Sequence, residues 1–118
     1  MANHPAPGLG RTFAALADPT RRAILARLER EEKVSISALA KPLAIKLPAV
    51  MKHLDVLADA GLITRTKWGR TVDVRLFPEP LQEATAWLAR YERFWSPRLY
   101  RLAAYAEDVE AKTRESDE

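Results

Sequence analysis

The strongest constraint in the sequence is the order of segments within residues 39–70. A short helical segment, a tight turn and a second helical segment that begins near Pro48 are followed by a basic hairpin. In the second segment Val50, Leu54 and Leu57 recur at i, i+4 and i+7, so they form one apolar stripe that has to face a core. This order predicts a helix-turn-helix followed by a wing, in a mainly α fold with a small β-hairpin.

The side of the second helix opposite the stripe carries a single cation. At about 100° per residue Lys52 points away from the core, with small residues beside it and with Met51 and His53 at the edges of the stripe. Such a face fits a DNA groove, whereas the basic residues before the helix and in the hairpin suit phosphates. The expected DNA contacts are Lys46, Pro48, Ala49, Met51, Lys52, His53, Arg65, Lys67 and Arg70.

Charge is distributed unevenly along the chain. Residues 1–78 carry thirteen Lys and Arg against seven Asp and Glu, whereas residues 107–118 carry two against six. The net charge of +3 therefore conceals a basic first part, where a polyanion would bind. A solvated basic surface is the alternative, and the helix-turn-helix pattern favours double-stranded DNA.

Composition limits the class of protein. A chain of 118 residues with 47% hydrophobic content fits one domain of ordinary size. Its apolar runs are shorter than the roughly 20 residues of a membrane span, and prolines near the start argue against a signal peptide, so we expect a cytoplasmic protein without membrane contact. Cysteine is absent, and no glycine-rich phosphate loop, nucleophile with a His partner or carboxylate pair indicates an enzyme.

Local signals place the remaining elements of the first part. Residues 1–10 are expected to form a disordered leader, with the winged helix-turn-helix over residues 11–78. Asp18 and Pro19 are suited to begin a helix that ends near Arg30, and Ser35 is suited to cap the next one. The arginines of the 19–30 helix are expected to face water or phosphate: Arg21, Arg22 and Arg27.

The hairpin follows Gly61, which suits the left-handed residue at a helix end. Residues 62–67 and 71–76 alternate in polarity, and Trp68-Gly69-Arg70 supplies the turn between them. A hairpin with charged edges often only prevents aggregation, so its position directly after a helix-turn-helix is what identifies it as a wing.

Residues 79–112 are predicted to form a C-terminal helical dimerisation region. Apolar residues recur there at alternating steps of three and four, with an extra step of four at Pro97, which either kinks one helix or divides it in two. A homodimer would cover this face, and the alternative is a helix folded back on its own core. Residues 113–118 are expected to be an acidic, frayed tail. The expected dimerisation residues are Leu81, Ala84, Leu88, Tyr91, Trp95, Leu99 and Leu102.

Four segments in this order resemble a known family. They are LADPTRRAIL (residues 16–25), LPAVMKHLDVLADAGLI (47–63), the Gly69-Arg70 turn and the WLxRYxxFW stretch (87–95). Together they resemble the ArsR/SmtB winged helix-turn-helix repressors, in the branch without metal-binding cysteines, over residues 11–110. The resemblance implies a homodimeric transcription factor, with helix 47–60 in the major groove and the wing, residues 62–77, on the flanking backbone or minor groove.

The sequence departs from the family pattern at informative positions. Lys46 stands where many relatives have a Ser or Thr cap, which suggests that Lys46 contacts a phosphate, and Met51 replaces a small hydroxyl residue. Residues 34–43 contain no Cys, His, Asp or Glu, and residues 80–112 contain no His, so we expect neither metal nor cofactor. A carboxylate-only site between subunits stays open, and no small-molecule effector is indicated. A winged helix that binds protein instead of DNA is the alternative function.

Overall fold

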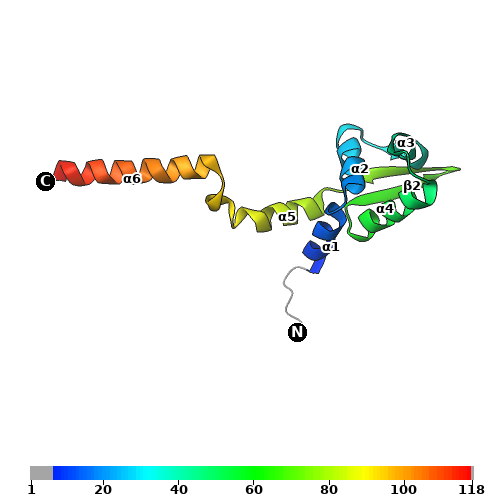
Figure 1. The fold of residues 1–118 in the computed structure, drawn as a ribbon, viewed down its shortest axis with the longest axis horizontal. Coiled ribbons are helices and arrows are strands. Elements are labelled where there is room, and N and C mark those ends of the chain that lie inside the picture. The colour runs from blue at the N-terminus through cyan, green and yellow to red at the C-terminus, as the bar shows by residue number, and fades with distance from the viewer. Residues whose placement is uncertain (1–6, 118) are drawn as a thin grey trace. The chain divides into compact units, whose positions relative to one another are not determined.

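The computed structural model describes the backbone of residues 7–117, and the side chains of these residues except 7, 97–100, 102–103 and 114–117. The chain divides into two compact units after Ala84. The elements of the first unit are α1 (Pro7–Leu16), α2 (Pro19–Arg30), β1 (Val34–Ser35), α3 (Ile36–Ala40), the 3-10 helix η1 (Lys41–Leu43), α4 (Leu47–Asp59), β2 (Ile63–Trp68), β3 (Thr71–Leu76) and the first half of α5 (Glu79–Ala89) (Figure 1). The second unit continues α5 and adds η2 (Glu92–Phe94) and α6 (Pro97–Asp117).

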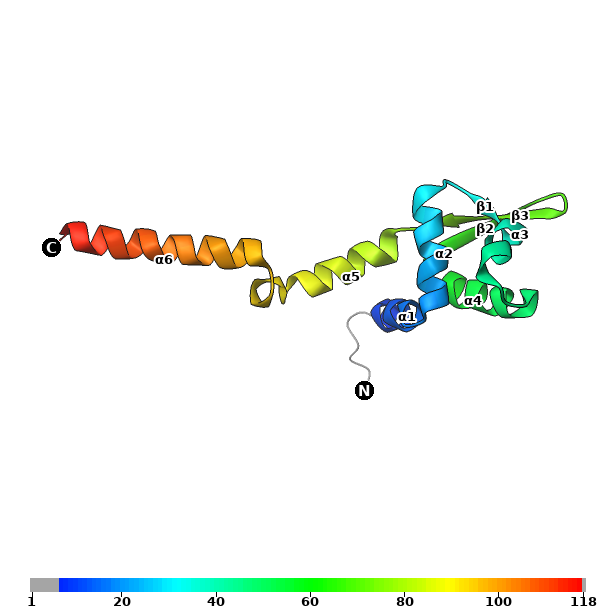
Figure 2. The same cartoon turned by 45° about the horizontal axis from the view of Figure 1, so that its top comes forward.

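The sheet has three antiparallel strands in the order β1-β3-β2 (Figure 2). β2 and β3 form the predicted hairpin, with Ile63 opposite Leu76 and Trp68 opposite Thr71. The third strand was not predicted: β1 is only two residues long and pairs Val34 with Val74. A strand this short shows no alternation of polarity, so only its pairing with β3 defines it.

The core of the first unit lies between α2, α4 and the sheet, with α1 and α3 packed at its sides. The predicted stripe of α4 is confirmed, because Val50, Leu54 and Leu57 are each 0% exposed. The other large contributors come from α2, α3, the three strands and the residue before β2, namely Ile24, Leu25, Leu28, Val34, Leu39, Leu62, Ile63 and Val74.

Both predicted helix caps are present. Asp18 Oδ2 accepts a hydrogen bond from the backbone N–H of Arg21 at 3.0 Å, and Pro19 occupies the first turn of α2. Ser35 Oγ accepts from the backbone N–H of Ala38 at 3.2 Å at the start of α3. The bond from Arg21 holds the pKa of the Asp18 carboxyl below its ordinary value of 3.8, because it favours the ionised form.

Part of the expected disordered leader is helical. Residues 1–6 lie outside the described part of the chain, but residues 7–10 are helical, so this part of the prediction is wrong. Pro7 stands at the first position of α1, where a missing N–H costs nothing. Thr12 and Ala15 are buried and fix the helix against the rest of the unit, which overrides the weak helix propensity of two glycines.

The structure decides between the two alternatives left open at Pro97. The helical region is divided rather than kinked, because α5 ends at Ala89 and α6 begins at Pro97, with η2 between them. The expected frayed tail is wrong, because α6 continues to Asp117. Proline at the first turn of a helix loses no hydrogen bond, so Pro97 starts α6 instead of interrupting a longer helix.

Two of the expected dimerisation residues are covered by other parts of their own chain. Ala84 is buried, and Leu81 packs against the core of the first unit. The alternative of a helix folded back on its own core therefore holds for the first turns of α5.

Within the described residues, no helix is both long enough and apolar enough to cross a membrane.

Gly61 and Gly10 give opposite expectations on replacement by alanine. Gly61 has a φ of +75°, so Gly61→Ala is expected to lower the free energy of unfolding by about 1 kcal/mol. Gly10 lies inside α1 with open space around its Cα, so Gly10→Ala is expected to raise it by up to about 1 kcal/mol. Urea unfolding at one fixed protein concentration measures both. Equal effects of the two substitutions would contradict the left-handed conformation at Gly61.

The Asp18 carboxylate predicts a contribution to stability that depends on pH. Because its pKa is lowered in the folded protein, the stabilisation is complete above 3.8 and is lost as the pH falls through the folded pKa. Asp18→Asn keeps a capping side chain but cannot titrate in this way. In thermal unfolding followed by circular dichroism, the melting temperature of the wild type is expected to approach that of Asp18→Asn below pH 3.8. A constant difference across that range would show that the carboxylate charge does not matter.

Candidate nucleic-acid interface

The exposed side of α4 is fixed by the side that is buried. With the apolar stripe facing the core, Lys52 and Pro48 lie on the exposed side and Ala49 is half-buried beside them. Lys46 stands at the N-cap, where a lysine side chain has no acceptor for the free N–H groups of the first turn. The positive end of the helix and the Lys46 ammonium therefore lie next to each other, and both attract anions.

The two residues predicted at the edges of the stripe turn toward the protein. Met51 is half-buried and packs against the core cluster. His53 is also half-buried, with Nδ1 3.2 Å from Arg21 Nη1 and 3.9 Å from Asp18 Oδ2. His53 thus lies against the start of α2, a contact that helical periodicity alone does not reveal.

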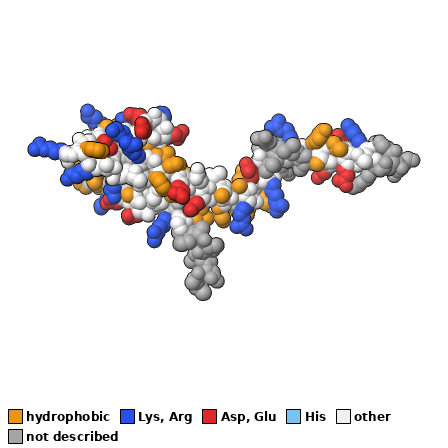
Figure 3. Space-filling view, turned by 180° about the vertical axis from the view of Figure 1, so that it is seen from behind, with side chains coloured by type: hydrophobic (Ala, Val, Ile, Leu, Met, Phe, Trp, Pro, Cys, Tyr) orange, Lys and Arg blue, Asp and Glu red, His pale blue; other side chains and the backbone are white. Residues whose placement is uncertain are grey.

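The wing carries the other predicted cations. Lys67, Gly69 and Arg70 are exposed, and Trp68 at the turn is 67% exposed. Lys and Arg side chains project from the end of the wing and from the part of the chain around it (Figure 3). Arg65 differs from the other cations, because its Nη1 donates to Asp55 Oδ1 of α4 at 2.7 Å and so joins the wing to the helix.

A small groove lies between the wing turn and the starts of α3 and α4. Its volume is about 280 Å³, and the residues that line it include Ser35, Ser37, Leu47, Arg70 and Thr71. Ser37 and Thr71 were not among the predicted contacts. They come from segments far apart in the sequence, so no spacing pattern could have grouped them with α4.

All three arginines expected to face water or phosphate bind backbone carbonyls; Arg22 is exposed as expected, but Arg21 and Arg27 are half-buried, which corrects the prediction for these two. Arg21 donates from Nε to Ala15 O at 2.7 Å and from Nη2 to Ala14 O at 3.1 Å. Arg22 donates from Nη1 to Leu16 O at 2.7 Å. These carbonyls belong to the last turn of α1, where no further helical N–H is available, and a cation there is favoured by the helix dipole.

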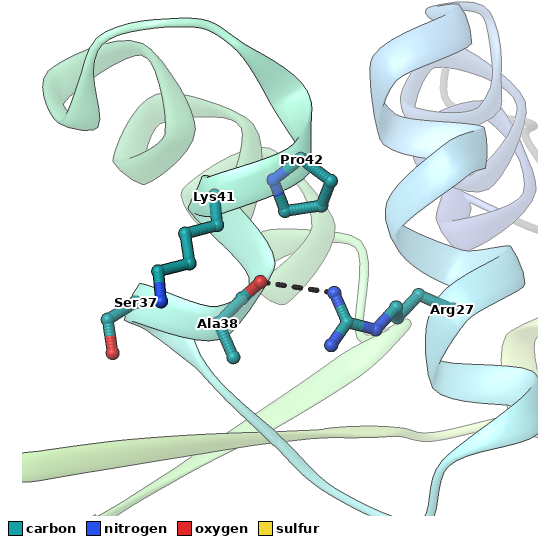
Figure 4. Close-up of a pocket in the computed structure, with 5 residues that line it drawn as sticks. All are labelled: Arg27, Ser37, Ala38, Lys41 and Pro42. Atoms are coloured by element: carbon teal, nitrogen blue, oxygen red, sulfur yellow. Dashed lines mark hydrogen bonds between the residues drawn. The ribbon is translucent and has the colours of Figure 1, made fainter.

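Arg27 has a similar structural role on another helix. Its Nη1 donates to Ala38 O of α3 at 3.0 Å (Figure 4). Its Nε pairs with Glu31. The same guanidinium borders an open hollow of about 740 Å³ that is also lined by Lys41 and Pro42. Among the described residues, no group of three or more His, Cys, Asp and Glu is placed to hold a metal ion.

Comparison with known proteins identifies the family. A model of a helix-turn-helix domain matches residues 16–66. The chain is 34% identical to the HTH-type transcriptional regulator Rv2034 of Mycobacterium tuberculosis, over 86% of this chain and 89% of that protein. It is 31% identical to the arsenic resistance transcriptional regulator ArsR1 of Pseudomonas putida, over 80% and 77% of the two chains.

Solved structures agree with this assignment. The crystal structure of an ArsR family transcriptional regulator is 43% identical, covers 82% of this chain and 98% of its own, and superposes with a TM-score of 0.71. An ArsR-like regulator from Rhodococcus sp. RHA1 is 34% identical over 86% and 95% of the two chains, with a TM-score of 0.65. The chain therefore belongs to the ArsR family of helix-turn-helix proteins and is a DNA-binding transcriptional regulator, not an enzyme.

Proposed function

We propose that the protein is a repressor that binds its operator as a homodimer, with α4 in the major groove and the β2–β3 wing on the flanking backbone or minor groove. The observation that carries this proposal is the burial of the apolar stripe of α4, which leaves Lys52 on the exposed side of a helix beside a basic wing. The expected cytoplasmic location follows from this function as part of the same proposal.

The contacts divide by the chemistry of each side chain. Lys52 is proposed to reach base edges, with Pro48 and Ala49 allowing the helix to approach closely. Lys46, Lys67 and Arg70 are proposed to bind phosphates, together with the hydroxyls of the small groove at Ser37 and Thr71.

The other predicted contacts have partners within the protein. Arg65 already donates a hydrogen bond to Asp55, so a phosphate would have to replace Asp55 or share the guanidinium with it. Met51 and His53 are left out of the proposed contact set, because both are half-buried against the rest of the first unit.

The proposed dimer surface is narrower than the seam predicted from the sequence. Leu81 and Ala84 pack on their own chain, and the side chains of Leu99 and Leu102 lie outside the described ones. The second unit exposes large apolar side chains on α5, η2, α6 and the links between them, and a patch of this kind usually marks an interface between proteins. These side chains are Trp87, Leu88, Tyr91, Phe94, Trp95, Tyr105 and Val109.

A titration followed by fluorescence anisotropy tests DNA recognition, with the tightest duplex selected by the wild type from a random library and a scrambled duplex beside it. The wild type is expected to prefer the selected duplex by about 10³-fold. Lys46→Ser is expected to weaken binding and to reduce the salt slope by about 0.9, because one phosphate contact is lost. The same change is expected to raise the free energy of unfolding by about 1 kcal/mol, because serine caps α4.

Arg30→Gln is the control for charge alone, since it removes one cation from α2 rather than from α4 or the wing. It is expected to leave the salt slope unchanged. Unchanged or tighter binding by Lys46→Ser would exclude the phosphate contact. Equal, weak binding of both duplexes by the wild type would contradict specific recognition and favour a protein partner.

Sedimentation velocity over a range of concentrations tests the homodimer. Leu88→Glu places a charge on the proposed interface, where Leu88 is 40% exposed, and is expected to raise the dissociation constant of the dimer at least about tenfold. Val56→Glu is the matched control, because Val56 is 38% exposed but lies on α4. A wild type that stays monomeric, or a Leu88→Glu variant that associates as the wild type does, would contradict this interface.

A further inference from the structure

Arg21 connects three helices of the first unit. Its backbone N–H donates to the Asp18 cap of α2, while Nε and Nη2 donate to the carbonyls of Ala15 and Ala14 in the last turn of α1. Its remaining terminal nitrogen, Nη1, lies 3.2 Å from Nδ1 of His53 on α4. The guanidinium is therefore held in place by α1 and offers one donor to α4.

The chemistry of this contact decides which partner donates the hydrogen bond. Arginine has donors and no acceptor, so His53 Nδ1 has to accept, which requires a lone pair on Nδ1 and the ring proton on Nε2. The Asp18 carboxylate, with Oδ2 3.9 Å from the same Nδ1, lies beside the pair. The contact between α2 and α4 is thus a directional hydrogen bond from the Arg21 guanidinium to Nδ1 of the His53 ring.

The apolar stripe decides which side of α4 faces outward, and a directional bond limits the rotation of the helix more tightly. Val50, Leu54 and Leu57 bury α4 firmly, but contacts between aliphatic groups depend little on angle, whereas a hydrogen bond weakens steeply when its angle changes. His53 directly follows Lys52 on α4. A rotation of α4 that breaks the bond to Arg21 therefore also changes the direction in which the Lys52 side chain leaves the helix.

We propose that Arg21 is a positioning residue for DNA recognition, which fixes the rotation of α4 through His53 and thereby aims Lys52. This inference rests on the proposed placement of α4 in the major groove. Arg21 binds no DNA in this scheme and acts on affinity only through α4.

Arg22 supplies a matched control. Both arginines cap the last turn of α1, Arg21 at Ala14 and Ala15 and Arg22 at Leu16. Arg21 makes two carbonyl bonds and Arg22 one, and only Arg21 also reaches His53. A comparison of Arg21→Gln with Arg22→Gln therefore separates the link to α4 from the capping of α1.

The test measures the affinity of the full chain for the selected and scrambled duplexes over a range of salt. Arg21→Gln is expected to bind the selected duplex about tenfold more weakly, with the scrambled duplex and the salt slope little changed. Arg22→Gln is expected to match the wild type. Equal losses in the two variants would overturn the proposal, and so would a slope lowered by about 0.9 on both duplexes, which would identify a phosphate contact by Arg21.

Variants of His53 keep the test valid if Arg21→Gln is poorly folded. His53→Leu removes the acceptor and is expected to lose affinity as Arg21→Gln does, with no further loss in the double variant. His53→Asn places an amide oxygen near the position of Nδ1 and is expected to restore most of the affinity. Additive losses, or an equal defect in the Asn and Leu variants, would contradict the link.

The ring nitrogens of His53 give a readout that does not depend on DNA. In the free wild type, nitrogen NMR is expected to show Nδ1 unprotonated and Nε2 protonated, and Arg21→Gln is expected to change this pattern. A proton on Nδ1 in the wild type would overturn the proposal. A wild type that does not distinguish the two duplexes would instead refute the proposed function, so the two failures are separate.

Discussion

The burial of one face of α4 is the constraint on which the rest of the first unit depends. Val50, Leu54 and Leu57 are fully buried, and full burial of an aliphatic side chain is worth roughly 1.5–3 kcal/mol. An exposed ion pair such as Arg65 with Asp55 contributes at most about 1 kcal/mol. Apolar contacts therefore decide which side of α4 faces outward, and the exposed cations take the positions that are left.

Polar contacts at the helix ends refine this arrangement. The arginines of α2 hold neighbouring backbone, Arg21 and Arg22 at the end of α1 and Arg27 at Ala38 of α3. In an isolated sequence, arginines beside a DNA-binding motif are naturally interpreted as phosphate contacts. The structure separates two groups of cations: those that hold the helices together and those on α4 and the wing that remain exposed.

The C-terminal part shows where periodicity ceases to be informative. The alternating spacing of apolar residues correctly predicted helices and an apolar face. Leu81 and Ala84 nevertheless pack on their own chain, whereas Leu88 and Phe94 are exposed on the second unit. A heptad pattern specifies that a face is apolar, but not whether the same chain or a second copy covers it, because the hydrophobic effect has no direction.

The sequence by itself determined the order of the main helices and the hairpin, the buried stripe of α4, the caps at Asp18 and Ser35 and the turn at Gly61. Each of these depends on residues within a few positions of one another, whose chemistry acts locally. Only the tertiary structure decided the pairing of β1 with β3, the groove that joins Ser37 to Thr71, and the bond between Arg21 and His53. Those contacts join residues far apart in the chain, and packing of the whole unit is what brings them together.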